Sequence, residues 1–396
     1  MKTLTARRLL TDVGVVEFAV VEVGEDGLIA DINSDPRALA GNTDTLTAAF
    51  FDVHTHGAMG HDVMEASCDE LGEMQRFLAT RGVAQYLPTT VTAPVDATLK
   101  SLEALADAIE SEPREGEARA VGIHLEGPFL SHLRRGVHPA DLLQPPSVEL
   151  FDRFQQAARG HIALVTIAPE PNAARPGQTP ESALELIAHA TAGGVRVSLG
   201  HTNATAAEAM AGVKAGAVSA THTFNAMRPL EHREPGVLGV VISNDAMWGE
   251  LICDGVHVAP EVVKIWFRAK AAAKRILVTD AMSAAGMPDG DYWLAGLPVT
   301  VADGRAFLKD DMTAGKTTLA GSVLTMDRAV ENLQAFAGAT LGEAVACASD
   351  HPAAMLGRGE LTRMSVGSLA NLNRFDGKGR LVGTCVRGVE VRASRG

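Results

Sequence analysis

The stretch RVSLGHTNATAAEAMAGVKAGAVSATH, residues 196–222, contains one complete unit of the fold that we predict. Residues 195–202 and 218–224 are short, mostly apolar runs of the kind that forms buried strands. The alanine-rich segment between them, residues 204–215, is compatible with a helix. A strand, a helix and a second strand in this order are typical of a parallel sheet built from βα units.

The same alternation continues on both sides of this stretch. Further segments compatible with helices are residues 69–81, 260–274 and 322–336. Eight apolar runs can be counted, namely residues 50–54, 85–90, 120–127, 162–169, 195–202, 218–224, 250–257 and 275–281. Eight βα units close a (β/α)8 barrel of about 250 residues, so the sequence predicts an α/β fold of the TIM-barrel type.

The two chain ends have a different pattern. Residues 13–23 and 380–394 alternate with Gly- and Asp-containing turns and predict strands, which we expect to pair in one small β-sandwich. We therefore expect three segments: the first part of the small domain at 1–49, the barrel at 50–349 and the second part of the small domain at 350–396. Within the barrel, residues from about 283 to 318 are rich in turns and predict a hairpin inserted over the barrel mouth.

Composition excludes several classes of protein. Apolar residues make up 46% of the chain and charged residues 21%, which is typical of a folded globular protein. The 35 basic and 48 acidic side chains leave a net charge of −13, which disfavours nucleic acid and anionic membrane surfaces as partners. No apolar stretch approaches a membrane span of about 20 residues. The four cysteines are far apart, so we expect neither a disulfide framework nor a zinc knuckle, and a cytoplasmic location.

Metal-binding side chains follow the predicted strands at the point where each strand ends, where barrels of this kind place their active sites. They are His54, His56, Glu126, His201, His222 and Asp280. Imidazole and carboxylate donors suit zinc, or else iron, manganese or cobalt. A divalent ion with an open position lowers the pKa of water, and an aspartate such as Asp280 can then accept the proton. The alternative for Asp280 is a helix N-cap.

Seven blocks of sequence make the pattern specific. They are GIHLEGPFL (122–130), SLGHTNA (198–204), THTFNAM (221–227), REPG (233–236), DGVHV (254–258), VTDAM (278–282) and LAGSVLTM (319–326). With the His-x-His at positions 54 and 56, the chain resembles the amidohydrolase superfamily and, within it, the N-acetylglucosamine-6-phosphate deacetylase family. The resemblance spans about 270 residues in the family order.

The resemblance implies roles for individual residues. Glu126, His201 and His222 would bind the principal metal. Many members of the family lack the first-strand histidine pair and use a single metal, so a second, weaker position at His54 and His56, bridged through Glu126, is our own expectation from the residues of this chain. Asp280 would act as the acid and base, and His138 would polarise the acetyl carbonyl. The substrate would be held by Val137, His138, Asn225, Ala226, Arg233, Asp254, His257, Leu319, Ala320 and Gly321.

The implied activity is metal-dependent hydrolysis of N-acetyl-D-glucosamine 6-phosphate to D-glucosamine 6-phosphate and acetate, in amino-sugar catabolism and cell-wall sugar recycling. Arg233 suits bidentate phosphate contact, although a surface salt bridge is its alternative. We expect a homodimer in which Arg233 reaches the neighbouring pocket, and a mobile loop at 131–139 that brings His138 to the substrate. The alternatives are another amidohydrolase, such as a cyclic-amide hydrolase or nucleobase deaminase, and a catalytically silent sugar-phosphate binding protein.

Overall fold

The computed structural model describes residues 1–396 apart from 40, 113, 172–181 and 395–396. All eight predicted barrel strands are present and lie side by side in the order β15-β14-β13-β12-β11-β10-β8-β5. Their bounds are β5 (Phe50–Thr55), β8 (Val83–Thr90), β10 (Ile123–Glu126), β11 (Ile162–Ile167), β12 (Arg196–Leu199), β13 (Ser219–Ala220), β14 (Trp248–Ile252) and β15 (Arg275–Val278). The described pairs between neighbouring strands are parallel, as βα units require.

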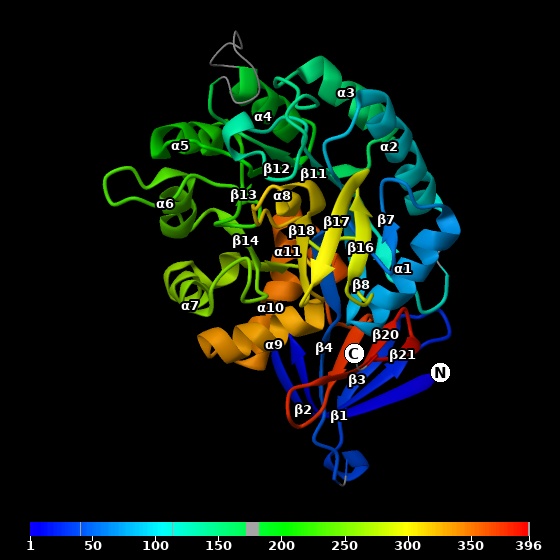
Figure 1. The fold of residues 1–396 in the computed structure, drawn as a ribbon. Helices are drawn as coiled ribbons and strands as arrows, with labels where there is room; N and C mark the ends of the chain where they lie inside the picture. Colours follow the sequence, from blue (N-terminus) through cyan, green and yellow to red (C-terminus); the bar gives the residue numbers. More distant parts are fainter. Residues whose placement is uncertain (40, 113, 172–181, 395–396) are drawn as a thin grey trace.

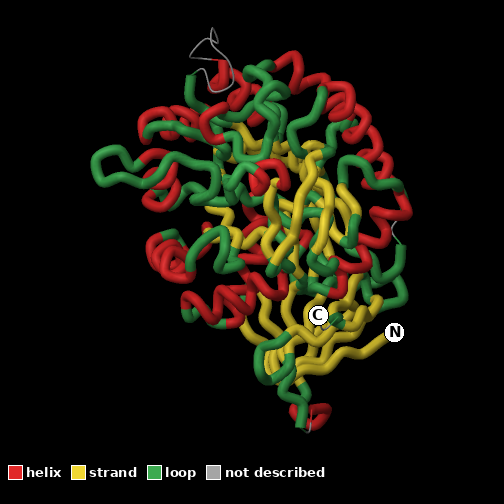
Figure 2. The backbone as a smooth tube through the Cα atoms, viewed as in Figure 1, coloured by secondary structure: helices red, strands yellow, loops and turns green. Residues whose placement is uncertain are grey.

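The first and last strands approach each other and nearly close the barrel. Backbone hydrogen bonds join Asp280 N to His54 O (2.9 Å) and His56 N to Ala281 O (2.7 Å). Residues of β5 and β15 are fully buried, as are most residues of the other barrel strands, because helices cover the sheet from outside. Figure 2 shows the strands gathered in the centre with helices at the periphery.

The outer helices follow the strands in chain order. They are α1 (Cys68–Thr80), α2 (Val95–Glu110), α3 (Val148–Ala157), α4 (Ser182–Ala192), α5 (Ala206–Ala215), α6 (Gly236–Ser243), α7 (Pro260–Ala269), α9 (Met326–Ala337), α10 (Leu341–Ala348) and α11 (Asp350–Leu356). Serine or threonine begins several of them; Ser67, Thr205 and Thr340 each form a capping box with a glutamate three residues later. None of the described helices combines the length and the apolar character of a membrane-spanning segment.

The two chain ends form one sheet of seven strands in the order β21-β20-β19-β4-β1-β2-β3. Its strands are β1 (Lys2–Thr11), β2 (Gly14–Val23), β3 (Ile29–Ser34), β4 (Thr45–Ala48), β19 (Leu372–Phe375), β20 (Leu381–Val386) and β21 (Val389–Arg392). The sheet curls so that its two ends meet, since Ala370 N donates to Gly27 O (2.9 Å) and Gly388 N donates to Ala370 O (3.2 Å). Both termini lie at this sheet (Figure 1).

The small sheet lies against the ends of β5 and β8 at which these strands begin. The Phe50 and Phe375 rings are 6.2 Å apart, and Asn373 Nδ2 donates to Gly82 O (3.0 Å). We predicted the second part of the small domain from residue 350, but α11 packs on β5 and β15. We therefore propose a boundary between α11 and β19. The predicted site residues, at the opposite, carboxyl ends of the strands, are separated from this sheet by the barrel.

The segment predicted as an inserted hairpin contains a third strand and a short helix. The strands β16 (Gly290–Leu294), β17 (Leu297–Ala302) and β18 (Arg305–Leu308) form an antiparallel sheet, followed by α8 (Lys309–Thr313). Buried apolar residues of this insert, including Leu294, Val299 and Val301, pack with Met282 after β15 and Val91 after β8. The insert therefore covers the carboxyl ends of the barrel strands (Figure 1).

Candidate active site

Three predicted site residues share one backbone geometry. His201, His222 and Asp280 are each the second residue after their strand, and their φ angles are 46°, 29° and 49°. Residues other than glycine rarely adopt positive φ, and such strain persists only where the surrounding structure holds it. The turn conformation directs each of these side chains into the barrel mouth, where they meet His56 and Glu126 at one cavity.

Glu126, the last residue of β10, lies at the centre of the group. Its Oε1 atom is 3.1 Å from His222 Nε2 and 3.3 Å from His201 Nε2. The two histidine Nε2 atoms are 3.0 Å apart. One carboxylate oxygen and two imidazole nitrogens thus converge on one side of Glu126.

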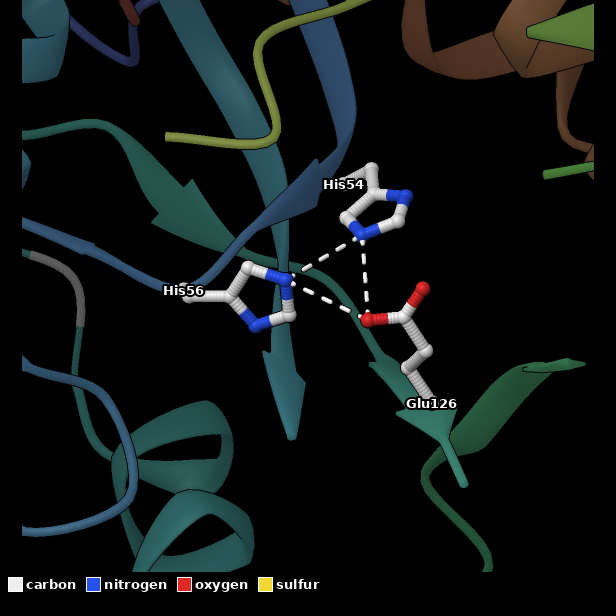
Figure 3. A group of neighbouring side chains, drawn as sticks. All are labelled: His54, His56 and Glu126. Carbon is white, nitrogen blue, oxygen red and sulfur yellow. Dashed lines mark hydrogen bonds and ion pairs between the residues drawn. The ribbon is translucent and has the colours of Figure 1, made fainter. Parts of the chain in front are cut away.

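The other oxygen of Glu126 faces the His-x-His pair. Its Oε2 atom is 3.5 Å from His54 Nε2 and 3.4 Å from His56 Nε2, and these two nitrogens are 3.2 Å apart (Figure 3). Asp280 Oδ1 lies 3.1 Å from His56 Nε2 and 3.4 Å from His54 Nε2. Glu126 therefore bridges two groups of donors.

The histidines are oriented as metal ligands require. His56 Nδ1 lies 2.9 Å from Thr89 O, and His201 Nδ1 lies 3.0 Å from Arg134 O. Because a carbonyl only accepts, both Nδ1 atoms carry a proton, and both Nε2 atoms face the centre of the site, where they can donate to the carboxylates while protonated or bind an ion once deprotonated. Such buried nitrogen and oxygen donors, with His56 and His201 each held by an outer hydrogen bond, fit a divalent metal ion.

The histidines keep the carboxylates ionised. Burial favours the neutral form of Glu126 and Asp280, but the attraction of His54 outweighs it, together with hydrogen bonds from the surrounding histidines. The pKa values of both carboxyl groups therefore lie below their usual values. Asp280 is consequently a carboxylate that can accept a proton.

His138 lies at the same cavity, with its Nε2 3.7 Å from Glu126 Oε2. Thr92 N donates to His138 Nδ1 (3.2 Å), and Thr92 Oγ1 is 2.8 Å from the same nitrogen. Since a backbone N–H only donates, Nδ1 is an acceptor and the ring proton is on Nε2. Burial, followed by the charge of His201, lowers the pKa of His138 to about 4, so the ring is neutral at neutral pH.

The segment 131–139, which we expected to move as a lid, is tied to the site. Ser131 N donates to His201 O (3.0 Å), and His201 Nδ1 donates to Arg134 O (3.0 Å). His138 is already in the cavity, so no lid movement is needed to bring it there.

The cavity has a volume of about 270 Å³, near the lower end for a small-molecule site. The predicted substrate residues that line it are Val137, His138, Asn225, Ala226, His257, Leu319 and Gly321. Asp254 lies behind His257 and accepts a hydrogen bond from its Nδ1 (2.6 Å), while Ala320 is buried within the insert core. Leu294, Thr317 and Thr318 of the insert also line it, as do Val91 and Gly136.

Arg233 is outside this cavity. It is exposed on the loop between β13 and α6, which projects from the barrel (Figure 1). Among the described residues none forms a hydrogen bond or ion pair with its side chain, so the surface salt bridge considered as its alternative is not seen in that part of the chain. Within one chain, Arg233 does not complete the site.

Sequence reasoning missed three buried side chains that support the site. Glu250 accepts from His54 Nδ1 (3.3 Å), Asp52 accepts from His54 N (3.2 Å), and Thr92 holds His138. Burial, partly offset by a hydrogen bond from Thr279, raises the pKa of Asp52 to about 6. Glu250 and Asp52 lie inside apolar strand runs, and a charged residue in a fully buried strand is costly enough to be a signal of function.

Comparisons with known proteins agree on one family. The profile of the amidohydrolase family matches residues 45–391. An N-acetylglucosamine-6-phosphate deacetylase of Bacillus subtilis (strain 168) is 36% identical over 365 residues, which is 88% of each chain. An N-acetylgalactosamine-6-phosphate deacetylase of Escherichia coli O157:H7 is 36% identical over 376 residues, which is 94% of each chain.

Solved structures give the same result. A variant of the Mycobacterium smegmatis N-acetyl-D-glucosamine-6-phosphate deacetylase, solved in complex with N-acetyl-D-glucosamine 6-phosphate, superposes with a TM-score of 0.88 at 32% identity, covering 98% of both chains. The Thermotoga maritima N-acetylglucosamine-6-phosphate deacetylase superposes with a TM-score of 0.86 at 31% identity, covering 99% of this chain and 100% of the other.

Proposed function

This chain belongs to the amidohydrolase family, and from that premise we propose that it is a deacetylase that converts N-acetyl-D-glucosamine 6-phosphate to D-glucosamine 6-phosphate and acetate. The observation that carries the proposal is the position of an ionised Asp280 beside the Glu126 and histidine donors, with a neutral His138 across the same cavity. The relatives named for this activity support the choice of substrate.

We further propose that the donors hold a divalent metal, with zinc as the leading candidate and iron, manganese or cobalt as alternatives. Glu126, His201 and His222 would hold the principal ion, and His54 and His56 with Glu126 a second one. Such an ion supplies a lowered water pKa and polarisation of the acetyl carbonyl.

Asp280 acts first as the general base and then as the general acid in this mechanism. As a carboxylate, it accepts a proton from the water that attacks the acetyl carbonyl carbon. When the carbon–nitrogen bond breaks, the same group delivers that proton to the amine nitrogen, so the sugar leaves as a neutral amine. The position of Asp280 next to His56 keeps it ionised between turnovers.

His138 stabilises the oxygen on which charge develops. Its Nε2–H faces the cavity because Thr92 occupies Nδ1, so it can donate a hydrogen bond to the acetyl oxygen. A fixed donor in a buried site stabilises that charge without reorganisation during the reaction.

The sugar and its phosphate require the remaining groups of the cavity. We propose that Asn225, His257 and the backbone near Ala226 bind the phosphate end, and that the insert contacts the sugar. Because Arg233 is exposed on a projecting loop, we propose that it enters the cavity of a second copy in a homodimer. A cytoplasmic location is part of the same proposal.

Acetate release from purified, metal-loaded protein tests the proposal. We expect turnover of N-acetylglucosamine 6-phosphate, much weaker turnover of unphosphorylated N-acetylglucosamine, and none of cyclic amides or nucleobases. The 4-epimer, N-acetylgalactosamine 6-phosphate, belongs in the same assay because the Escherichia coli relative is named for it. A clear preference for that epimer, or for an unphosphorylated sugar, would contradict the proposed substrate.

A further inference from the structure

Glu250 is a buried carboxylate to which the mechanism above gives no role. It lies in the middle of β14, fully buried inside the barrel. Its Oε2 atom accepts from His54 Nδ1 (3.3 Å) and from the backbone N–H of His222 (3.2 Å). Among the described residues none donates to its Oε1 atom.

This arrangement is costly for the fold. A buried carboxylate loses its hydration, and an oxygen without a hydrogen-bond donor loses more. The one ion-pair partner of Glu250 in the described part of the chain is His54, itself fully buried. A hydrophobic side chain would fill this position at lower cost, so stability of the fold does not account for the glutamate.

The contact with His54 determines how this histidine presents its nitrogens. A carboxylate accepts, so Nδ1 carries a proton, and Nε2, which faces Glu126 Oε2 and His56 Nε2, is the nitrogen that can lose its proton and bind an ion. His56 obtains the same orientation from the neutral carbonyl of Thr89. His54 is therefore the member of the pair whose orientation depends on a charged group.

We propose that Glu250 is a positioning residue that orients the imidazole of His54. Its negative charge also makes His54 a stronger ligand, and so strengthens cation binding at the position formed by His54, His56 and Glu126. This inference rests on the proposed metal site. Carboxylates behind ligating histidines raise the basicity of the ligand and fix its tautomer.

The second hydrogen bond links the two halves of the site. The backbone N–H of His222, whose φ angle is 29°, is held by the same oxygen that holds His54. Glu250 thus contacts one residue from each donor group. Its removal is expected to weaken ion binding more at the position of His54 than at that of His222, because only the contact with His54 involves a ligating ring.

Two substitutions separate charge from hydrogen bonding. In Glu250→Gln the amide oxygen can still accept both bonds, but the charge is lost; in Glu250→Leu both are lost. Glu117→Gln and Glu117→Leu are matched controls, because Glu117 is also a buried glutamate, paired with Arg76 outside the barrel mouth. All five proteins are prepared metal-free, checked for folding by circular dichroism, and titrated with zinc in competition with a chromophoric chelator, with elemental analysis for stoichiometry.

We expect the parent and both controls to bind two ions per chain. Loss of an outer-shell partner typically weakens metal binding by about 10- to 100-fold, so we expect about 10-fold weaker binding of the second ion in Glu250→Gln and about 100-fold in Glu250→Leu. The visible spectrum of the cobalt-loaded protein should change in the Glu250 variants and not in the controls.

The outcomes are distinguishable. If the parent binds two ions and folded Glu250→Leu binds the second as tightly as Glu117→Leu does, the role of Glu250 is refuted while the metal site stands. If the parent itself binds a single ion, the proposed second metal position is wrong, and the proposed role of Glu250 at that position is refuted as well. If Glu250→Leu does not fold, an unchanged second affinity in Glu250→Gln refutes the contribution of charge.

Discussion

Replacement of Asp280 by asparagine isolates the proton-transfer role of this residue. Asparagine has nearly the same shape and, like aspartate, tolerates the positive φ of 49° at this position. The backbone bonds of residue 280, from its N to His54 O (2.9 Å) and from Ser322 N to its O (2.7 Å), do not involve the side chain. The fold should therefore be retained.

The expected loss follows from what the amide cannot do. A neutral amide does not accept the proton of the attacking water, and a general acid or base contributes about 10²- to 10⁴-fold in rate, or about 2.7 to 5.5 kcal/mol. The lost charge also removes the attraction between Asp280 Oδ1 and His56 Nε2, 3.1 Å apart, so metal content must be measured as well. We expect kcat for Asp280→Asn to fall by a factor within this range when rates are normalised to bound metal.

Acetate release at saturating substrate, with elemental analysis of the same samples, gives this number. Asp303→Asn is the matched control, because Asp303 also has a positive φ, 51°, but is exposed in the turn between β17 and β18. Its rate should equal that of the parent. A rate for Asp280→Asn within a factor of about three of the parent, at equal metal content, would refute Asp280 as the base.

Three further predictions concern other parts of the chain. Arg233→Ala should lower kcat/KM for the phosphorylated sugar by about 10- to 150-fold, the value of a charged hydrogen bond, and leave the unphosphorylated sugar unchanged; equal losses on both would exclude a phosphate contact. Thr92→Val removes one of two hydrogen bonds to His138 Nδ1, so kcat should fall by about 5-fold with unchanged metal content, and a fully active variant would show that the backbone N–H suffices. Burial lowers the pKa of Lys270 to about 8, below its value in the unfolded chain. Above pH 8 the unfolded state therefore binds more protons than the folded state, and the free energy of unfolding should rise with pH towards 10. Denaturant titrations of Lys270→Met should lack this rise, and an equal rise in the parent and the variant would contradict the shift.

The barrel could be predicted because its strands are continuous apolar runs and its polar residues stand where those runs end. All eight strands were predicted, although β13 contains only Ser219 and Ala220. The strand β1 (Lys2–Thr11) was not recognised, because Arg7 and Arg8 interrupt its alternation, while Leu4, Ala6 and Leu9 are buried. The third strand of the insert was missed because turn-rich sequence does not specify how many strands lie between its turns.

Site residues could be predicted where the strand end itself supplies the signal. Glu126, His201 and Asp280 follow that rule. Thr92 was not predicted, although it follows the end of β8, because a threonine is not a metal-binding or titratable side chain and gives no signal of its contact with His138. The surroundings of Arg233 could not be predicted either, since they depend on whether a second copy is present.

At positions 201, 222 and 280 the backbone has a positive φ, which favours glycine, whereas the proposed reaction requires a histidine or an aspartate side chain. Glycine is the residue that these turns would accept most readily, and each non-glycine residue there costs about 1 to 3 kcal/mol. The proposed chemistry nevertheless needs histidine at 201 and 222 and aspartate at 280. A laboratory population selected for thermal tolerance alone should therefore accumulate glycine at these three positions, each replacement making the protein more stable as it removes a site residue.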